Sequence, residues 1–356
     1  MWRWGGRGSG RGRPQRLGPA FVATTLALGA CSGDYPHLHV GDRQVDAQIE
    51  ALAAALNAEP RYERRFVLVR ELSKAYRSVE AHRRQILFLT SYVQADSNDP
   101  FNAFYLTTVA QLYRELGSEP LARHYFERIL RNYPDALVEG DSIHLTALGQ
   151  LIELERNAAR RVDYYKELIA RFSDAIDLPR SHFFLAQAYE ELGEWEQAIQ
   201  SYGAFLAYPG TDIPGFANAY RQVLEKVHFY YSDKSWVVSD LDSLVAAIKR
   251  AIARRDPREL RRLQAKSNFF TMSWEQQTSD ESVALAFDLG AFPLSRVRFD
   301  RQLDDDSNTQ EAFLRTTGWS YRIETWYLYF RKVEFKPDPE VDGRWEWAGI
   351  FFGEKL

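Results

Sequence analysis

One eight-residue pattern occurs three times in the middle of the chain at nearly constant spacing. The copies begin at Val109, Leu148 and Leu185, so successive copies are 39 and 37 residues apart. The same offsets align Ala122–Leu130 with two later segments, which gives each unit two helices in constant register. Self-similarity of this period is typical of a helical solenoid, in which each helix pair buries its apolar face against the next pair.

The units resemble the tetratricopeptide repeat, whose small and large positions let antiparallel helix pairs nest. Two units fit best, one at residues 103–134 and one that ends near residue 206. The middle unit departs from the pattern because Arg156 and Arg161 stand where glycine and alanine are expected. The matching residues are Leu106, Val109, Ala110, Tyr113, Gly117, Ala122, Phe126, Ile129 and Pro134, and then Leu185, Ala186, Tyr189, Gly193, Trp195, Ala198, Tyr202 and Phe205.

Further helices are predicted on both sides of these units. A weaker unit spans about residues 61–100, and residues 45–57 carry one apolar stripe that is typical of an amphipathic opening helix. Residues 215–229 predict a closing helix. We therefore expect a repeat domain, similar to tetratricopeptide proteins, over residues 45–230.

The first thirty residues are typical of an export signal. They carry five arginines and no acid, and an apolar run over residues 19–28 follows the arginines. This run is much shorter than the roughly 20 residues that a membrane-spanning helix needs. The tetrapeptide that ends at Cys31 resembles the lipobox of bacterial lipoproteins, which implies a signal peptide over residues 1–30 and a diacylglycerol group on Cys31. An organellar presequence and a buried spare thiol are the alternatives.

Two further features bear on the location of the chain. In lipoproteins of this kind a serine after the cysteine, here Ser32, implies the outer membrane with the protein facing the periplasm. Residues 31–44 then form a tether.

Without residues 1–30 the net charge changes from −4 to −9, which argues against a nucleic-acid-binding protein. A single cysteine excludes an internal disulfide.

In tetratricopeptide proteins the first helices of successive pairs line a concave groove that binds protein segments. Side-chain amides at one repeat spacing can bond the backbone of an extended peptide, and apolar neighbours can add contact. Glutamine is also a good helix former on a solvated face, so a bare helical surface is the alternative. The positions that the resemblance places in the groove are Phe104, Thr107, Gln111, Arg114, Ile143, Thr146, Gln150, Glu153, Arg180, Phe183, Gln187 and Glu190.

Beyond residue 231 the pattern changes, and we expect a second, α+β domain over residues 238–356. Two helices are predicted first, with an apolar stripe over 241–252 and a capping box that starts at Asp256. Apolar alternation then predicts an antiparallel sheet with strands near 283–289, 297–299, 326–330 and 345–347. This order of elements resembles the nuclear-transport-factor-like and cystatin-like cones. Eleven aromatic residues between Trp319 and Phe352 form a core, a ligand pocket or an exposed surface for a partner.

No catalytic fingerprint or cofactor motif is found, so we expect neither an enzyme nor a bound cofactor. Asp304, Asp306 and Asn308 have the spacing of a calcium loop, but Thr309 replaces its glycine, so we expect a solvated turn and no metal. A basic cluster over residues 249–262 could contact anionic lipid, or it could be a solvated face that pairs with nearby acids.

Together these features predict a lipid-anchored protein of the cell envelope that acts as a scaffold for protein–protein interaction. Its partner would be a protein or peptide segment in the periplasm, and an anchor combined with such repeats is distantly similar to the outer-membrane assembly lipoprotein BamD. A role in outer-membrane assembly or transport would follow. The alternatives are a small-ligand carrier or unrecognised enzyme that uses a C-terminal pocket, and a structural spacer.

Overall fold

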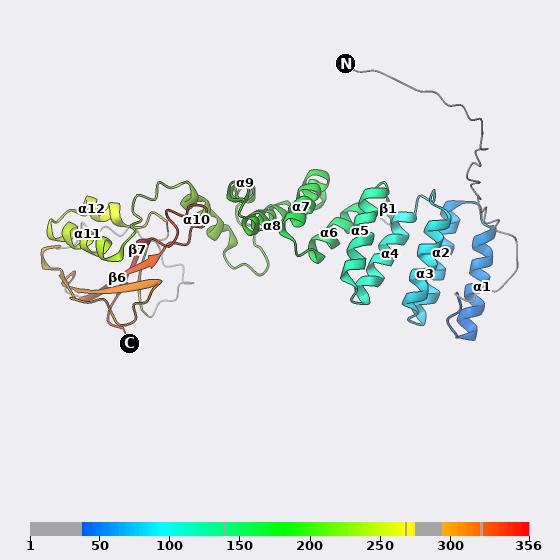
Figure 1. The fold of residues 1–356 in the computed structure, drawn as a ribbon, viewed down its shortest axis with the longest axis horizontal. Helices are drawn as coiled ribbons and strands as arrows, with labels where there is room; N and C mark the ends of the chain where they lie inside the picture. Colours follow the sequence, from blue (N-terminus) through cyan, green and yellow to red (C-terminus); the bar gives the residue numbers. More distant parts are fainter. Residues whose placement is uncertain (1–37, 139, 268, 275–293, 321–322, 356) are drawn as a thin grey trace, which may run out of the picture.

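The computed structural model describes residues 38–355 except 139, 268, 275–293 and 321–322. Figure 1 shows an elongated molecule, in which α1 lies at one end and a β-sheet with two helices lies at the other. The predicted signal peptide, Cys31 and the first part of the predicted tether lie outside the described residues. In the described part of the chain, every helix is too short or too polar to cross a lipid bilayer.

In the described residues, ten α-helices form the repeat region, and the prediction of a helical solenoid is confirmed. The pairs α2/α3, α4/α5, α6/α7 and α8/α9 follow one another along the long axis, between α1 and α10 (Figure 1). The helices are α1 (Arg43–Ala58), α2 (Tyr62–Ser78), α3 (His82–Ala95), α4 (Asn102–Glu115), α5 (Glu119–Asn132), α6 (Ile143–Leu154), α7 (Ala158–Phe172), α8 (Leu178–Leu192), α9 (Trp195–Leu206) and α10 (Ala219–Tyr231). A short hairpin of β1 (Leu137–Val138) and β2 (Asp141–Ser142) joins α5 to α6.

Local sequence explains where the helices begin and end. Gly193 follows α8 with φ of 75°, a left-handed conformation that glycine adopts without a Cβ clash. The middle unit lacks a glycine at this position, and its turn forms differently. Glu155 leaves α6 in an extended conformation, and the Asn157 side chain accepts a hydrogen bond from the Arg160 amide to cap α7. A capping asparagine therefore replaces the left-handed glycine.

Small and large side chains alternate in the core between helices, as the repeat pattern predicts. Leu106, Val109 and Ala110 of α4 and Ala122 and Phe126 of α5 are completely buried. Alanine at these positions lets the two helix backbones approach, and the large side chains fill the remaining space. One apolar cluster runs from α1 to α6, and another joins α8, α9 and α10.

The described residues of the C-terminal region form two α-helices and a five-stranded sheet. Its elements are α11 (Leu241–Ala253), α12 (Pro257–Leu263), β3 (Phe270–Ser273), β4 (Arg298–Phe299), β5 (Glu311–Thr317), β6 (Thr325–Lys332) and β7 (Trp345–Phe352). The strand order is β3-β7-β6-β5-β4. The antiparallel prediction is wrong for one pair, because β3 runs parallel to β7. The predicted strand near 283–289 lies outside the described residues.

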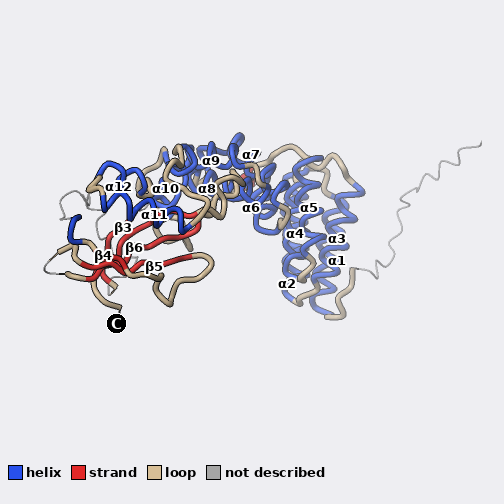
Figure 2. Tube along the Cα trace, turned by 60° about the vertical axis from the view of Figure 1, so that its left-hand side comes forward, coloured by secondary structure: helices blue, strands red, loops and turns tan. Residues whose placement is uncertain are grey.

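The two faces of the sheet differ. Figure 2 shows α11 and α12 lying over one face, where Leu244 and Ile248 pack with Leu328 and Trp347 in a buried core. Other aromatic side chains of the sheet region pack outside this core. Trp274, for example, stacks on Phe351 with ring centroids 4.2 Å apart. The aromatic residues of the sheet therefore form packed contacts on two sides.

Candidate functional site

Three of the predicted groove residues meet on the surface between α4 and α6. The Arg114 Nη1 atom lies 3.1 Å from Glu153 Oε2, and the same guanidinium donates a hydrogen bond to the Gln150 side chain. These residues come from adjacent repeats, 36 and 39 positions apart in sequence. Gln111 of α4 is exposed on the same helix as Arg114. This cross-repeat contact supplies a polar surface that could receive a peptide backbone.

Three other predicted groove residues are not on the surface. Thr107, Ile143 and Phe183 are buried, and the Thr107 hydroxyl donates to the Ala103 carbonyl oxygen at 2.9 Å. The expectation that Ile143 and Phe183 supply exposed apolar contact is wrong, because both side chains pack into the helix cores. Phe104 is half-buried, 5.1 Å from the ring of Phe66.

The remaining predicted positions have local partners. Thr146 donates to the Ser142 carbonyl oxygen at 3.0 Å, and the Arg180 guanidinium lies 5.6 Å from the centre of the Phe184 ring. Gln187 is half-buried on α8. The predicted glutamine ladder is therefore uneven, since the Gln150 amide already accepts from Arg114. Whether these surfaces bind a partner stays a prediction.

Glu190 lies in a different environment from the α4–α6 surface. Its carboxylate accepts a hydrogen bond from the Tyr202 hydroxyl at 3.0 Å and pairs with Lys226 Nζ at 2.6 Å. Burial raises the pKa of Tyr202, and the adjacent carboxylate raises it further. Glu190 thus belongs to a contact of α8 with α9 and α10.

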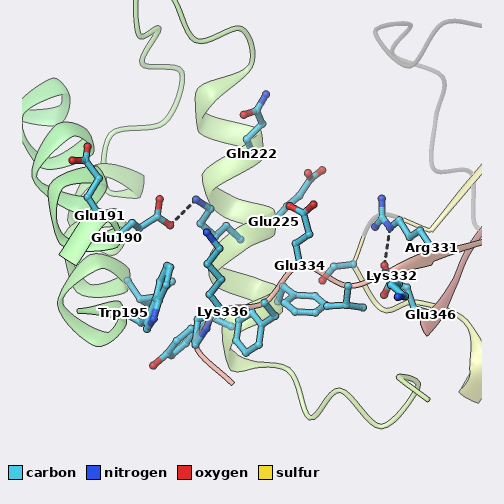
Figure 3. Close-up of a pocket in the computed structure, with 18 residues that line it drawn as sticks. Glu190, Glu191, Trp195, Gln222, Glu225, Arg331, Lys332, Glu334, Lys336 and Glu346 are labelled. Atoms are coloured by element: carbon cyan, nitrogen blue, oxygen red, sulfur yellow. Dashed lines mark hydrogen bonds and ion pairs between the residues drawn. The ribbon is translucent and has the colours of Figure 1, made fainter. Parts of the chain in front are cut away.

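A cavity of about 800 Å³ lies where the last repeat helices meet the C-terminal region. Helices α8, α9 and α10 form one wall, and the end of β6 with the following loop, residues 333–337, forms another (Figure 3). The lining combines aromatic rings with charged side chains of both signs. A hollow of this size and mixture suits a charged small molecule or a polar peptide segment.

Aromatic contacts hold the two walls of this cavity together. The ring centroids of Phe229 and Phe335 are 5.1 Å apart, and those of Tyr230 and Phe335 are 6.0 Å apart. Lys234 Nζ lies 4.7 Å from the centre of the Phe335 ring, within reach of a cation–π interaction. Burial lowers the pKa of Lys234. These contacts anchor the end of α10 against the β6–β7 connection.

The charged groups of the cavity include one buried acid. Glu346 is 2% exposed, and its two oxygens accept from Arg331 Nε and Trp236 Nε1, each at 2.8 Å. Because both oxygens are engaged, this carboxylate is poorly placed to act as a general acid or base.

Sequence reasoning did not find this cavity. Glu190 and Phe335 come from opposite ends of the second half of the chain, and no repeat or motif links them. A run of aromatic residues at the end of α10 was the available signal, because Phe229, Tyr230 and Tyr231 exceed what one helix face can bury.

The acidic turn after β4 binds a lysine side chain. Lys355 Nζ lies 2.5 Å from Asp304 Oδ1 and 2.7 Å from Asp306 Oδ2, and it is 4.4 Å from the centre of the Phe313 ring. Burial disfavours the ammonium, but the two aspartates outweigh burial and raise the pKa of Lys355. In the described part of the chain, no group of three or more His, Cys, Asp or Glu side chains could hold a metal ion.

Comparison with known proteins identifies the repeat. The sequence model of the tetratricopeptide repeat family matches residues 108–136 and 185–211, which overlap the two best predicted units. Two solved structures, titled "Crystal structure of MamA" and "Crystal structure of MamA protein", are each 17% identical. They cover 44% and 46% of this chain and 83% and 80% of their own chains, with TM-scores of 0.30 and 0.31. No curated protein matches.

The fold and the repeat match define a class of protein. The chain contains tetratricopeptide repeats within a longer helical solenoid, and repeats of this type generally bind other proteins. An extended stack of helix pairs presents a long surface with little chemistry of its own. The repeat region therefore suggests a protein–protein interaction scaffold.

Proposed function

We propose that this protein binds a segment of another polypeptide along the α4–α6–α8 side of its solenoid while an N-terminal lipid holds it at a membrane. The observation that carries the binding proposal is the cross-repeat surface of Gln111, Arg114, Gln150 and Glu153 on stacked tetratricopeptide units. Its donors and acceptors match those of an extended backbone.

The proposed location depends on the N-terminal sequence. Cys31 follows an arginine-rich and then an apolar segment, and Ser32 favours the outer membrane with the protein facing the periplasm. We propose that the partner is a periplasmic protein or peptide segment and that the scaffold serves outer-membrane assembly or transport, as the distant similarity to BamD suggests. This scaffold needs no cofactor and no catalytic centre.

Site-specific photo-crosslinking in cells tests the groove. Benzoylphenylalanine replaces Gln111 on α4 or Gln187 on α8, the first helices of their pairs. Matched controls replace His124 on α5 or Gln200 on α9, which are exposed on the second helices of the same pairs. We expect one shared polypeptide to crosslink from positions 111 and 187 and not from positions 124 and 200. Equal capture from all four positions would contradict the groove assignment.

The junction cavity favours a second candidate function, the binding of a small charged ligand. The observation is a hollow of about 800 Å³ with a buried acid, Glu346, in its wall. Helices α11 and α12 precede and cover the sheet, so we also propose a cone related to the nuclear-transport-factor-like or cystatin-like folds.

The second candidate has its own test. Ile199 lines the cavity, and Ile199→Trp would fill part of it. A screen of charged metabolites by thermal unfolding should find a compound that raises the Tm of the wild type and not of this variant. If no compound distinguishes the two proteins, the carrier function is rejected, and the groove proposal is unaffected.

A further inference from the structure

Positive charge is concentrated in one short stretch of the C-terminal region. Residues 249–266 contain eight cationic residues and two acids, a net charge of +6 in a chain whose total is −4, so the remaining residues carry −10. The cationic residues, called the basic face below, are Lys249, Arg250, Arg254, Arg255, Arg258, Arg261, Arg262 and Lys266. Such a separation of charge gives the molecule a strongly polarised electric field.

The two acids in this stretch are already used locally. Asp256 caps α12, where one carboxylate oxygen accepts from the backbone amides of Arg258 and Glu259, each at 3.1 Å. The Glu259 carboxylate forms two hydrogen bonds with the Arg262 guanidinium, at 2.7 and 2.8 Å. The hydrogen bond from Arg262 lowers the pKa of Glu259, so this acid is ionised and committed to one arginine. Within residues 249–266, these two acids therefore offset only two of the eight positive charges.

Packing of the helices turns these cations outward. Leu244, Ile248 and Ile252 of α11 and Leu260 and Leu263 of α12 are buried in the core above the sheet. Figure 2 shows α11 and α12 as an outer layer on that side of the sheet. The cations occupy the opposite sides of both helices, since all but Lys249 are exposed. The result is a raised helical surface and not a cleft.

Three arginines lie at or next to the turn between the two helices. Arg254, Arg255 and Arg258 are exposed, and within the described residues none of them forms a hydrogen bond or an ion pair through its side chain. The surface continues beyond the turn, because Lys249 Nζ lies 5.4 Å from the Phe299 ring of β4, next to the exposed Arg298. Exposed guanidinium groups on an outward surface fit an anionic surface better than a single buried anion.

We propose that the basic face docks on the surface of a bilayer that contains anionic phospholipid. Each Lys or Arg held near such a surface contributes about 1 kcal/mol, so a stretch with a net charge of +6 supplies substantial binding without a pocket. The −10 carried by the remaining residues is repelled by the same surface, which orients the molecule with α11 and α12 towards the lipid.

A nucleic acid is a poorer match for this surface. Single-stranded nucleic acids need aromatic side chains for base stacking, and residues 249–266 contain none. The acidic remainder of the chain would also repel an extended duplex that runs past α11 and α12. The proposal does not depend on acylation of Cys31, so it can fail or succeed independently of the proposed anchor.

Vesicle flotation of the full chain tests the proposal. All proteins carry Cys31→Ser and have the five arginines of residues 1–18 changed to Gln, so that neither a lipid nor the N-terminal charge contributes. The readout is partitioning into vesicles of equal parts phosphatidylglycerol and phosphatidylcholine, relative to phosphatidylcholine alone. This ratio removes any apolar contribution of residues 19–28. The test variant combines Arg254→Gln, Arg255→Gln and Arg258→Gln, and the control variant combines Arg43→Gln, Arg83→Gln and Arg221→Gln on exposed parts of the solenoid.

The expected results are quantitative. At about 1 kcal/mol per arginine, the test variant should lose roughly a hundredfold in the partition ratio, and the control variant should stay within a few-fold of its parent. Changing the same three test arginines to Lys should preserve binding, since a diffuse anionic surface recognises charge and not guanidinium geometry. Added NaCl should release the parent protein.

Several outcomes would overturn the proposal. These are equal losses in the test and control variants, loss of binding in the lysine variant, and partitioning of the parent that is insensitive to salt. Displacement of the parent from vesicles by a DNA duplex at equal charge concentration would indicate a nucleic-acid site instead. The lysine variant and the salt titration keep all eight positive charges of the basic face. They therefore decide the question even if the glutamine test variant unfolds.

Discussion

The Trp236 indole N–H donates a 2.8 Å hydrogen bond to the Glu346 carboxylate, and both side chains are buried. Trp236 lies just after α10, and Glu346 lies on β7, 110 residues further along the chain. Two backbone hydrogen bonds between Val238 and Trp345, at 2.8 and 2.9 Å, continue the contact. The segment that follows α10 is therefore fastened to β7 beside the junction cavity.

Removing the indole donor should loosen this junction. Trp236→Phe keeps an aromatic ring but removes one of the two hydrogen bonds that the buried Glu346 accepts from described side chains, so we expect a loss of about 1–3 kcal/mol in the free energy of unfolding. Denaturant titration of the wild type and the variant measures this change in the free energy of unfolding. Because the two residues are in contact, a double-mutant cycle of Trp236→Phe with Glu346→Gln should show a coupling energy of at least about 0.5 kcal/mol. Additive losses would show that the hydrogen bond contributes nothing beyond packing.

The helices of the repeat region could be predicted because their apolar residues recur at helical spacing and the units repeat. The two best units, for example, share Ala110 and Ala186 at one position. The groove was less predictable, because the packing of neighbouring helices decides whether a first-helix residue faces solvent. Ile143 and Phe183 are buried for this reason, whereas Arg114 is exposed.

The sheet was only partly predictable. In β5, Ala312, Phe313 and Leu314 are consecutive and all buried, so the strand shows no alternation of polar and apolar residues. The strand β3 is four residues long and pairs in parallel with the last strand, a contact that no local signal encodes. The junction cavity needs both regions in place, so no single segment predicts it.

Acid should destabilise the repeat region through Glu155. Burial alone would raise the pKa of this carboxyl, but the Asn157 amide and Arg123, which bond it at 2.9 and 3.0 Å, together with Arg160, lower it below its ordinary value of 4.5. The ionised form is therefore favoured in the folded state, and its contribution is present above pH 4.5 and lost as the pH falls through the lowered pKa.

The measurement is the free energy of unfolding of wild type and Glu155→Gln as a function of pH. Near neutral pH the variant should be less stable by about 2 kcal/mol, because Arg123 and Arg160 lose a charged acceptor. The difference should shrink below pH 4.5. A difference that stays constant down to strongly acidic pH would show that the ionisation of Glu155 is not linked to folding.

A glycine in β7 makes room for an aromatic ring. Phe270 and Gly349 are register partners in β3 and β7, and a Cβ on Gly349 would lie 2.7 Å from Phe270 Cζ. Tyr329 and Phe351 contact the same ring, so it cannot move freely. Gly349→Ala should lower the free energy of unfolding by about 1–3 kcal/mol.

Two further variants test this explanation. Adding Phe270→Leu to Gly349→Ala should recover part of the loss, because the smaller side chain clears the new methyl group. Gly149→Ala in α6 is the matched control. Apart from its chain neighbours and the backbone of its own helix, no atom lies within 4 Å of the added Cβ, so this substitution should stabilise the protein by up to about 1 kcal/mol. Equal effects of the two alanines would contradict the role of Phe270.

The proposed lipid anchor makes a prediction about Cys31. Acylation would place the protein in the membrane fraction, and Cys31→Ser should move it to the soluble fraction or leave it unprocessed with residues 1–30 attached. Mass spectrometry of the N-terminal peptide measures both outcomes. An uncut chain with an unmodified thiol in the wild type would reject the anchor. Ser9→Ala, in the same leader segment, is the control and should change neither processing nor fractionation.

The contact of Arg114 with Glu153 should matter for binding and not for stability. The two side chains are 44% and 58% exposed, and pairs of this kind contribute about 0–1 kcal/mol. Arg114→Ala should therefore change the free energy of unfolding by less than about 1 kcal/mol while it weakens crosslinking from position 111. Arg131→Ala, which removes an exposed partner of Glu127 on α5, should have a similarly small effect on stability and none on crosslinking. The comparison separates two roles for the α4–α6 surface: if both variants leave capture unchanged, the cross-repeat contact is only a surface ion pair, and the partner must bind elsewhere on the solenoid.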